Sequence, residues 1–494
     1  MAESELLKQL RVAIAGRSPL VYIHSPEEDR ILRGVRQLAG ELSRPVKEWS
    51  CVDGLSDAPA ETQDPVKALQ TVVASGVDAF YVFKDLAPFL SETRVVRALR
   101  EAYSDGHNHP DRMIVLVCAD MNVPEALKKE VHLLDISTPD EGEIEAQVKQ
   151  IIASNQDYTL PEGALREVIL ALKGLTENEI SYVFSRACRL RDATKEQLLD
   201  EIFSEKKNVV KKSGFLEFAP PRCTIDGLGG LDNLKNWLMK RRHMFTQEAL
   251  EAGVPIPKGL LIMGVSGCGK SLAVKTISSL WNIPMFRLDM NLVFSGMYGS
   301  PEAAFHNALK TIEAVSPAVL WVDEIENALG MDESGQRIAS HIFSSFLTWM
   351  QEKPPLIFIA ATANKIQAIP AEVLRKGRFD EVFFCDLPAP AEREEIFKIH
   401  LKRNGANLDE FDYKMLTIMT DGWNGAEIEQ AVISARTDAF YENRPFNNKD
   451  LSTVISRIVP LSDTMEAQIK AIRSWAFSRA TPASKYGKSA AKTR

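Results

Sequence analysis

The stretch GVSGCGKS at residues 264–271 constrains the fold of this chain more than any other segment. It follows the apolar run GLLIM at 259–263 and precedes the helical pattern LAVKTI at 272–277. This order predicts a strand, a tight loop and a helix, the context in which G-x-x-x-x-G-K-[ST] binds phosphate. Glycines let the backbone turn and direct N–H groups at phosphate oxygens, and the helix N-terminus adds its positive dipole end. We therefore expect an α/β domain whose parallel sheet carries a phosphate-binding loop.

The loop supplies a side chain for each charged part of a bound nucleotide. Lys270 is expected to neutralise the β- and γ-phosphates, and the Ser271 hydroxyl is expected to bind Mg²⁺. Cys268, inside the loop, is interpreted as a small filler rather than a redox switch. The predicted cofactors are therefore ATP and Mg²⁺. The residues expected to contact nucleotide here are Gly264, Val265, Ser266, Gly267, Cys268, Gly269, Lys270, Ser271 and Leu272.

A second strand is expected to deliver two carboxylates to the same edge of the sheet. The segment AVLWVDEIENAL at 318–329 is apolar up to Asp323 and Glu324. In an open parallel sheet, ligands bind outside the carboxyl ends of the strands. Asp323 is therefore expected to hold Mg²⁺, and Glu324 to orient or deprotonate the attacking water.

Two further segments complete the predicted catalytic set. In PLIFIAATANKIQAIP at 355–370, a buried strand ends near Asn364, which is expected to position the water; a turn-forming role is the alternative. In VLRKGRFDEVFFCDLP at 373–388, Arg375 and Arg378 can face a neighbouring subunit and neutralise transition-state charge there. Ordinary surface arginines are the alternative. Together these segments predict an ATPase.

Composition restricts the remaining classes of function. The net charge of −8 argues against broad nucleic-acid binding, which usually leaves a basic surface. No apolar run approaches the ~20 residues needed to cross a bilayer, and the start, MAESELLKQL, is acidic and amphipathic rather than signal-like. The six cysteines form no CxxC pair and no cluster with zinc spacing, as is usual in a reducing compartment. We therefore expect a protein that does not contact a membrane.

The first half of the chain repeats the order of the second half. DAFYVFKDL at 78–86 corresponds to PAVLWVDEIE at 317–326, and RMIVLVCADMNVPEAL at 112–127 corresponds to the strand before Asn364. PLVYIHSPEEDRILRGV at 19–35 corresponds to the strand, loop and helix around the phosphate-binding loop. Five such matches in one order indicate a duplicated α/β body with a helical lid. The strand–helix alternation of any α/β domain is the alternative.

The first copy lacks the residues that bind and hydrolyse a nucleotide. Its first strand is followed by IHSPEEDR without Gly-Lys-Ser, and Glu27 in this segment would repel phosphate. Lys84 replaces the metal-binding carboxylate, and Asp85 replaces the glutamate that activates water. We therefore expect residues 1–205 not to bind ATP.

The four nucleotide-site segments, in this order, resemble the AAA clade of AAA+ ATPases over residues 224–440. The phrases LWVDEIE, SSFLTWMQEK, ATANKIQAIPAEVLRKGRFDEVFF and SWAFSRATPAS are more closely similar to the Ycf-type AAA ATPases. These are hypothetical-chloroplast-reading-frame proteins of algal plastids and cyanobacteria, with bacterial relatives. The likeness extends over most of the chain.

The resemblance implies further nucleotide contacts. The segment IDGLGGLDNLKNWL is similar to the entry segment of AAA modules, where the backbone at Leu228 and Gly229 faces adenine. The segment DGWNGAEIEQAV is similar to the start of the lid helix that closes over the base, with Gly425 and Ala426 facing the nucleotide.

The resemblance also implies a ring. Arg375 and Arg378 match the paired arginine fingers of the family, which act across subunits of what is usually a hexamer. The loop that grips a threaded chain departs from the family pattern, because Gly296 replaces a basic residue and methionine stands where an aromatic is expected. Processive threading is therefore not implied, although apolar side chains remain available for grip. The possible pore-loop residues are Met297, Tyr298 and Gly299.

The predicted fold class is α/β: a P-loop AAA+ body with a parallel sheet, flanking helices and a helical lid. A degenerate AAA-like α/β body with its own small helical subdomain precedes it. In the C-terminal segment, Ile469, Ile472 and Trp475 are expected to pack on the lid. The predicted segments are 1–137 (degenerate body without P-loop), 138–202 (lid-like subdomain), 203–222 (linker), 223–388 (AAA+ body), 389–446 (helical lid), 447–484 (C-terminal helical segment) and 485–494 (basic disordered tail).

The predicted function is Mg²⁺-dependent ATP hydrolysis in an ATP-promoted homo-hexamer, coupled to remodelling or activating a protein client. Two alternatives remain open. One is a nucleic-acid-linked AAA+ motor, which the acidic charge disfavours; the other is a nucleotide-gated assembly switch without threading. The expected location is the cytoplasm, or the plastid stroma for an algal chain.

Overall fold

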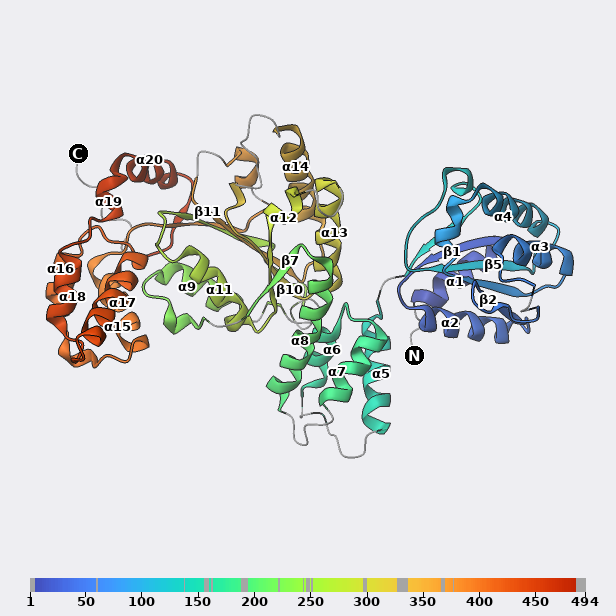
Figure 1. The fold of residues 1–494 in the computed structure, drawn as a ribbon, viewed down its shortest axis with the longest axis horizontal. Coiled ribbons are helices and arrows are strands. Elements are labelled where there is room, and N and C mark those ends of the chain that lie inside the picture. Colours follow the sequence, from blue (N-terminus) through green and yellow to red (C-terminus); the bar gives the residue numbers. More distant parts are fainter. Residues whose placement is uncertain are drawn as a thin grey trace. The chain divides into compact units, whose positions relative to one another are not determined.

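The structure is a computed structural model in which the chain forms two compact units (Figure 1). The first unit comprises Met1–Leu165 and Leu172–Leu198, and the second comprises Arg166–Ala171 and Leu199–Arg494. The described residues are 5–58, 61–136, 138–154, 160, 163–187, 194–220, 223–242, 244–245, 249, 252–295, 300–326, 336–365, 369–375 and 377–485.

A six-stranded sheet forms the centre of the first unit. Its order is β3-β2-β4-β5-β1-β6, and every neighbouring pair is parallel except β2 with β3. The strands β1, β4 and β5 are nearly continuous apolar runs, as expected for parallel strands buried on both faces. The strands are β1 (Leu20–His24), β2 (Val46–Ser50), β3 (Gly54–Leu55), β4 (Phe80–Lys84), β5 (Met113–Cys118) and β6 (His132–Asp135).

Helices cover both faces of this sheet. Side chains alternate along β1, so Leu20 and Tyr22 pack with α3 and α4, whereas Val21 and Ile23 pack with α1 and α2. Four helices follow β6, and among them α8 continues from the first unit into the second. The helices are α1 (Glu5–Ala15), α2 (Glu28–Glu41), α3 (Pro65–Ser75), η1 (Ala87–Ser91), α4 (Thr93–Gly106), η2 (Glu125–Leu127), α5 (Glu141–Ser154), α6 (Leu165–Leu172), α7 (Glu177–Ala187) and α8 (Lys195–Ser213).

A seven-stranded sheet forms the body of the second unit. Its order is β13-β12-β8-β11-β10-β9-β7, with only β7 antiparallel to its neighbour. The strands are β7 (Leu216–Ala219), β8 (Gly259–Gly264), β9 (Met285–Leu288), β10 (Ala318–Val322), β11 (Ile357–Ala363), β12 (Glu381–Cys385) and β13 (Thr481–Pro482).

Helices α12, α13 and α14 cover one face of this sheet, and α9 and α11 cover the other. Helices α15 to α18 form a separate apolar core, which is the helical lid. No described helix is long and apolar enough to span a membrane. The helices are η3 (Ile225–Gly227), α9 (Asp232–Arg241), α11 (Lys270–Trp281), α12 (Met290–Phe294), α13 (Pro301–Ala314), α14 (Gln336–Glu352), η6 (Ala371–Leu374), α15 (Pro390–Arg403), η7 (Leu408–Glu410), α16 (Tyr413–Met419), α17 (Gly425–Tyr441), α18 (Asn448–Ile455), α19 (Leu461–Thr464) and α20 (Glu466–Phe477).

The two units repeat one topology. The parallel strands run β2-β4-β5-β1-β6 in the first sheet and β9-β10-β11-β8-β12 in the second. In each sheet the first parallel strand of the chain therefore lies between the fourth and the fifth. The helix after that strand is α2 in the first copy and α11 in the second, and α7 occupies the place of α17 in the chain order. This agreement supports a duplicated body and makes each strand end of one copy comparable with its counterpart.

Residues 203–222, predicted as an exposed linker, are regular through Ala219. They contain the second half of α8 and the edge strand β7. Val210 and Leu216 are buried in the core of the second unit, and Lys206 is buried with its Nζ donating to the Val315 carbonyl at 2.8 Å. The prediction of a linker was wrong because Lys207 and Lys211 lie on the exposed side of a helix whose other side is buried.

The C-terminal segment also differs from its prediction. Helix α18 contributes Leu451 to the lid core, so the lid extends beyond residue 446. Ile469 lies in one core layer of the body and Ile472 and Trp475 pack against the other, so their predicted packing on the lid was wrong. The segment ends in strand β13, which pairs with β12. Beyond Lys485, the predicted tail lies outside the described residues.

Candidate nucleotide site

A cavity of about 380 Å³ lies at the carboxyl ends of β8, β10 and β11, between the body and the lid of the second unit. Gly264 and Val265 lie at the end of β8 and are not among its lining residues, and neither are Arg375 and Arg378. The predicted site residues that line it are Leu228, Gly229, Ser266, Gly267, Cys268, Gly269, Lys270, Ser271, Leu272, Asp323, Glu324, Asn364, Gly425 and Ala426.

The phosphate-binding loop depends on glycine at two close approaches. Gly264 has φ +145°, and a Cβ there would lie 2.0 Å from the Cys385 carbonyl oxygen. Gly267 has φ +76°, and a Cβ there would lie 2.7 Å from the Asn424 side chain. Larger residues would fill or displace this cradle. Because the cradle opens at the N-terminus of the twelve-residue helix α11, it fits the phosphates of a nucleotide.

Lys270 is buried against its own loop. Its side chain donates to the carbonyl oxygens of Gly264 at 3.0 Å and Val265 at 2.8 Å. Burial lowers the pKa of the ammonium group. The lysine therefore holds the loop in shape and must exchange these carbonyls for phosphate oxygens when nucleotide binds.

An oxygen cluster suited to Mg²⁺ lies beside the loop. The Ser271 hydroxyl donates to Asp323 Oδ1 at 3.4 Å, and the Thr362 hydroxyl donates to the same atom at 2.6 Å. Hydroxyl and carboxylate oxygens are the ligands that Mg²⁺ prefers, so the donor set fits this ion.

The Glu324 and Asn364 side chains, which follow two separate strands, meet at the cavity. The Asn364 side chain donates to Glu324 Oε1 at 2.7 Å. Glu324 has φ +48°, a left-handed conformation that costs a non-glycine residue ~1–2 kcal/mol. Its backbone N–H donates to the Thr362 hydroxyl at 3.0 Å. Buried Glu326 accepts from the Asn364 backbone N–H at 2.8 Å. Thr362 and Glu326 thus join the ends of β10 and β11.

The lid helix α17 starts against the loop. The Ala426 N–H donates to the Gly267 carbonyl at 3.1 Å. Asn424 and Glu427 form a capping box, each side chain accepting from the other's backbone N–H, at 2.9 and 2.8 Å. The bond from Ala426 to Gly267 therefore holds the start of α17 against the phosphate-binding loop, and the capping box fixes where the helix begins.

Strand β13 brings one residue to the cavity that the sequence did not indicate. Ser484 follows β13 and lines the cavity. The Asn233 side chain donates to the carbonyls of Pro482 at 3.0 Å and Ser484 at 3.1 Å. A two-residue strand has no periodic pattern, so no sequence signal predicted this contribution.

Comparisons with known proteins show which family the sequence resembles. The model for the ATPase family associated with various cellular activities (AAA) matches residues 260–387. Models for the N-terminal and second domains of SpoVK-like AAA ATPases match residues 6–136 and 142–213. The AAA domain-containing protein ycf46 of Guillardia theta is 34% identical over 95% of this chain and 94% of its own length. Its counterpart in Pyropia yezoensis is 34% identical over 95% and 97%.

The chain belongs to the ycf46 family of AAA ATPases. More distant relatives include the proteasome-activating nucleotidase of Thermococcus onnurineus, 27% identical over 52% of this chain and 66% of its own. The matches confirm the predicted family and the prediction of an ATPase.

The two predicted arginine fingers of this AAA ATPase are not among the residues that line the cavity. The Arg375 side chain is 70% exposed and pairs with Glu372 at 3.6 Å. Arg378 donates to the Glu372 carbonyl at 2.5 Å. The possible pore-loop residues Met297, Tyr298 and Gly299 lie outside the described residues.

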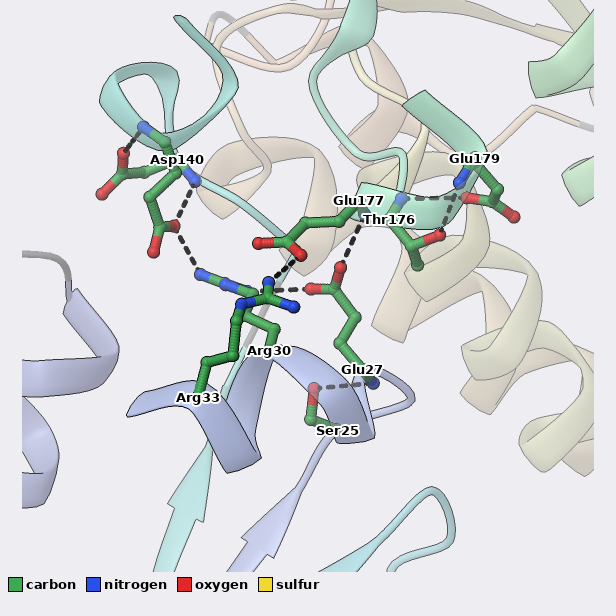
Figure 2. A network of polar contacts seen from close by, with 9 residues as sticks. Ser25, Glu27, Arg30, Arg33, Asp140, Thr176, Glu177 and Glu179 are labelled. Atoms are coloured by element: carbon green, nitrogen blue, oxygen red, sulfur yellow. Dashed lines mark hydrogen bonds and ion pairs between the residues drawn. The ribbon is translucent and has the colours of Figure 1, made fainter. Parts of the chain in front are cut away.

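The first copy of the α/β body has side chains in place of a phosphate-binding loop (Figure 2). The buried Glu27 carboxylate, at the start of α2, accepts from the Glu177 N–H at the start of α7 at 2.7 Å. Arg30 donates to Glu27 at 2.8 Å and to Glu143 of α5 at 2.5 Å. A carboxylate therefore joins the strand–helix turn to the lid-like helices of this copy.

The other catalytic positions of the first copy are also occupied by internal contacts. Lys84 pairs with Glu48 at 2.9 Å. Asp85 has φ +50°, close to the +48° of Glu324, so the backbone shape persists after the chemistry has changed. Asn122 donates its side-chain N–H to the backbone of η1 at 3.2 Å. The Lys84 and Asn122 side chains therefore bond other groups of the first copy.

Replacing Arg30 with alanine is expected to destabilise the first unit by ~3–5 kcal/mol, because it leaves the buried Glu27 carboxylate without its partner. Burial raises the pKa of Glu27. An acid with a raised folded pKa contributes stability at low pH and loses it as pH rises. Without the Arg30 guanidinium the folded pKa of Glu27 rises further, so the carboxyl group is protonated more readily in the variant, and the destabilisation should be smaller at pH 5 than at pH 8.

Urea titration followed by hydrogen exchange in residues 20–187 measures this effect. Arg33→Ala is the matched control, since Arg33 is 57% exposed and its ion pair with Glu177 is expected to contribute at most about 1 kcal/mol. An equal loss of unfolding free energy in Arg30→Ala and Arg33→Ala would show that the buried pair does not join the strand–helix turn to the lid-like helices.

Proposed function

We propose that this AAA ATPase hydrolyses Mg²⁺-bound ATP in an oligomeric ring and uses the energy to remodel or activate a protein client. One observation carries the catalytic part. A connected series of hydrogen bonds runs along the wall of the cavity, which the lid also lines. It joins Ser271, Asp323, Thr362, Glu324 and Asn364.

The residues divide the work as follows. Lys270 and the N–H groups of the loop bind the phosphates, while Ser271 and Asp323 hold Mg²⁺. The ion, when bound, neutralises negative charge on the phosphates. Glu324 accepts a proton from the attacking water, and Asn364 keeps the carboxylate oriented toward it.

The ring and its shared sites are supported by the two arginines. Arg375 and Arg378 are not among the residues that line the cavity of their own chain, and Arg375 projects into solvent. An arginine placed this way can complete a neighbour's site.

A protein client is supported by relatives whose names describe work on proteins. They include a proteasome-activating nucleotidase and an ATP-dependent zinc metalloprotease, FtsH 2 of Petrotoga mobilis, 28% identical over 48% of this chain. The net charge of −8 disfavours nucleic acid as the client. A nucleotide-gated switch without threading is the second candidate, favoured by Gly296 at the position where relatives of the clade carry a basic pore-loop residue.

A trap variant tests the choice of client. Glu324→Gln, purified from native extract with ATP, should retain a protein that Lys270→Ala, the empty control, does not. A nucleic acid enriched only in the trap would favour the motor instead. Rings without any client would favour the switch.

The first copy is proposed to serve as a body that binds no nucleotide. In the full chain we therefore expect one ATP bound per subunit in the wild type, and none above background in Lys270→Ala. Equilibrium dialysis with labelled ATP measures both values. A second equivalent of ATP, or binding that survives Lys270→Ala, would show that the first copy is a nucleotide site.

A further inference from the structure

Thr362 connects the two acidic residues of the site through a single hydroxyl. It lies at the end of β11 and is 2% exposed. Its hydroxyl donates to Asp323 Oδ1 at 2.6 Å and accepts from the Glu324 N–H at 3.0 Å. The hydroxyl thus donates its only proton to the Asp323 side chain and accepts a hydrogen bond from the Glu324 backbone.

These two bonds set the geometry that the site requires. The Asp323 carboxylate receives both hydrogen bonds on Oδ1, from Ser271 and Thr362, so among the described residues Oδ2 has no protein partner. Glu324 has φ +48°, a region that side-chain-bearing residues seldom adopt, and its N–H is held there by Thr362. Without the hydroxyl, both the carboxylate and the turn lose this support.

The first copy has the same strand end without the residues expected to bind metal and activate water. Register pairs Lys84 with Val117 in the first sheet and Val322 with Ala361 in the second. One residue further along the second pair of strands, Asp323 lies opposite Thr362. Because Lys84 stands in the place of Asp323, Val117 is the counterpart of Thr362. The Asp85 N–H donates to the Val117 carbonyl at 2.9 Å instead of to a hydroxyl. The copy without the metal-binding carboxylate therefore also lacks this hydroxyl.

We propose that Thr362 is a positioning residue that orients Asp323 toward Mg²⁺ and Glu324 toward water. The proposal rests on the proposed function of the site, but it concerns one chain and needs no ring or client. A purely space-filling role would require only the β-branched shape, which valine shares. The hydroxyl is therefore the part to be tested.

The test compares Thr362→Val with Thr362→Ser in the full chain. Mg²⁺ is titrated against a fluorescent ATP analogue, and the same analogue is bound in EDTA without metal. We expect Thr362→Val to bind the metal-free analogue like the wild type, which also reports a folded site. Its apparent Mg²⁺ affinity should fall ~10–100-fold, because outer-shell partners typically have effects of that size.

Turnover gives a second readout. In Thr362→Val, kcat should fall ~10–100-fold with little change in KM, and Thr362→Ser should restore most of both values. Thr420→Val is the matched control, since Thr420 is also fully buried but bonds the Leu416 carbonyl within the lid.

Three results would overturn the proposal. They are wild-type Mg²⁺ affinity and kcat in Thr362→Val, equal defects in the serine and valine variants, or equal defects in Thr420→Val. If the wild-type chain itself binds nucleotide without any effect of Mg²⁺, the proposed function fails together with it. If the protein forms no rings or retains no client, the Mg²⁺ titrations still test the role of Thr362, because they measure the site of one chain.

Discussion

Replacing Arg378 with alanine is expected to leave ATP binding intact and to lower turnover by about 10³-fold or more, the effect of losing an arginine supplied in trans. Arg378 is not among the residues that line the cavity of its own chain, where its own ATP would bind. Its guanidinium donates to the Glu372 carbonyl, which holds it near the surface. Binding is measured with a fluorescent ATP analogue and turnover by phosphate release.

Arg97→Ala is the control for Arg378→Ala, because Arg97 is an exposed arginine of the first unit that pairs with Glu101 of its own helix at 2.8 Å. It should leave turnover unchanged. Turnover above a tenth of the wild-type rate in Arg378→Ala would refute the role of this residue as a shared catalytic group.

Replacing Glu324 with glutamine should reduce turnover ~10²–10⁴-fold, the contribution of a positioned general base. The amide keeps the length of the side chain and can still accept from Asn364, whose Nδ2 lies 2.7 Å from Glu324 Oε1. It cannot take a proton from water, so ATP binding should persist while hydrolysis stops.

Glu352→Gln, on the exposed end of α14, is the control and should hydrolyse ATP like the wild type. Single-turnover measurements separate chemistry from product release. If Glu324→Gln hydrolyses bound ATP at the wild-type rate in a single turnover, another group must activate the water.

The sequence predicted the phosphate-binding loop well because its chemistry is local. The glycines, Lys270 and Ser271 all lie within residues 264–271, and the flanking strand and helix place them without any contact from distant parts of the sequence. The sequence also predicted that Asp323, Glu324 and Asn364 lie at one sheet edge, because they follow apolar strands that end there.

Thr362 and Glu326 were missed because their roles depend on register between strands. Nothing within ATAN distinguishes a hydroxyl that bonds Asp323 from one that packs in a core. Only the pairing of β10 with β11 places it there. Glu326 likewise looks like any acid after a strand until the Asn364 backbone is found beside it.

The sequence showed which nucleotide-site residues the first copy lacks. It did not show the contacts that take their place. Glu27 was expected to repel phosphate. In the structure it is buried, paired with Arg30 and bonded to the start of α7. The partners Glu143 and Glu177 lie more than a hundred residues away in sequence, so local patterns carry no sign of them.

The measurement that tests the shared site most directly mixes two inactive chains. Lys270→Ala cannot bind ATP but still carries Arg378, whereas Arg378→Ala binds ATP but lacks the arginine. Co-assembled, they should recover turnover, because some Arg378→Ala sites gain a neighbour with an intact arginine. Mixing Lys270→Ala with Glu324→Gln should recover none. If Lys270→Ala and Arg378→Ala co-assemble and turnover does not recover, Arg378 does not act on the site of a neighbouring subunit.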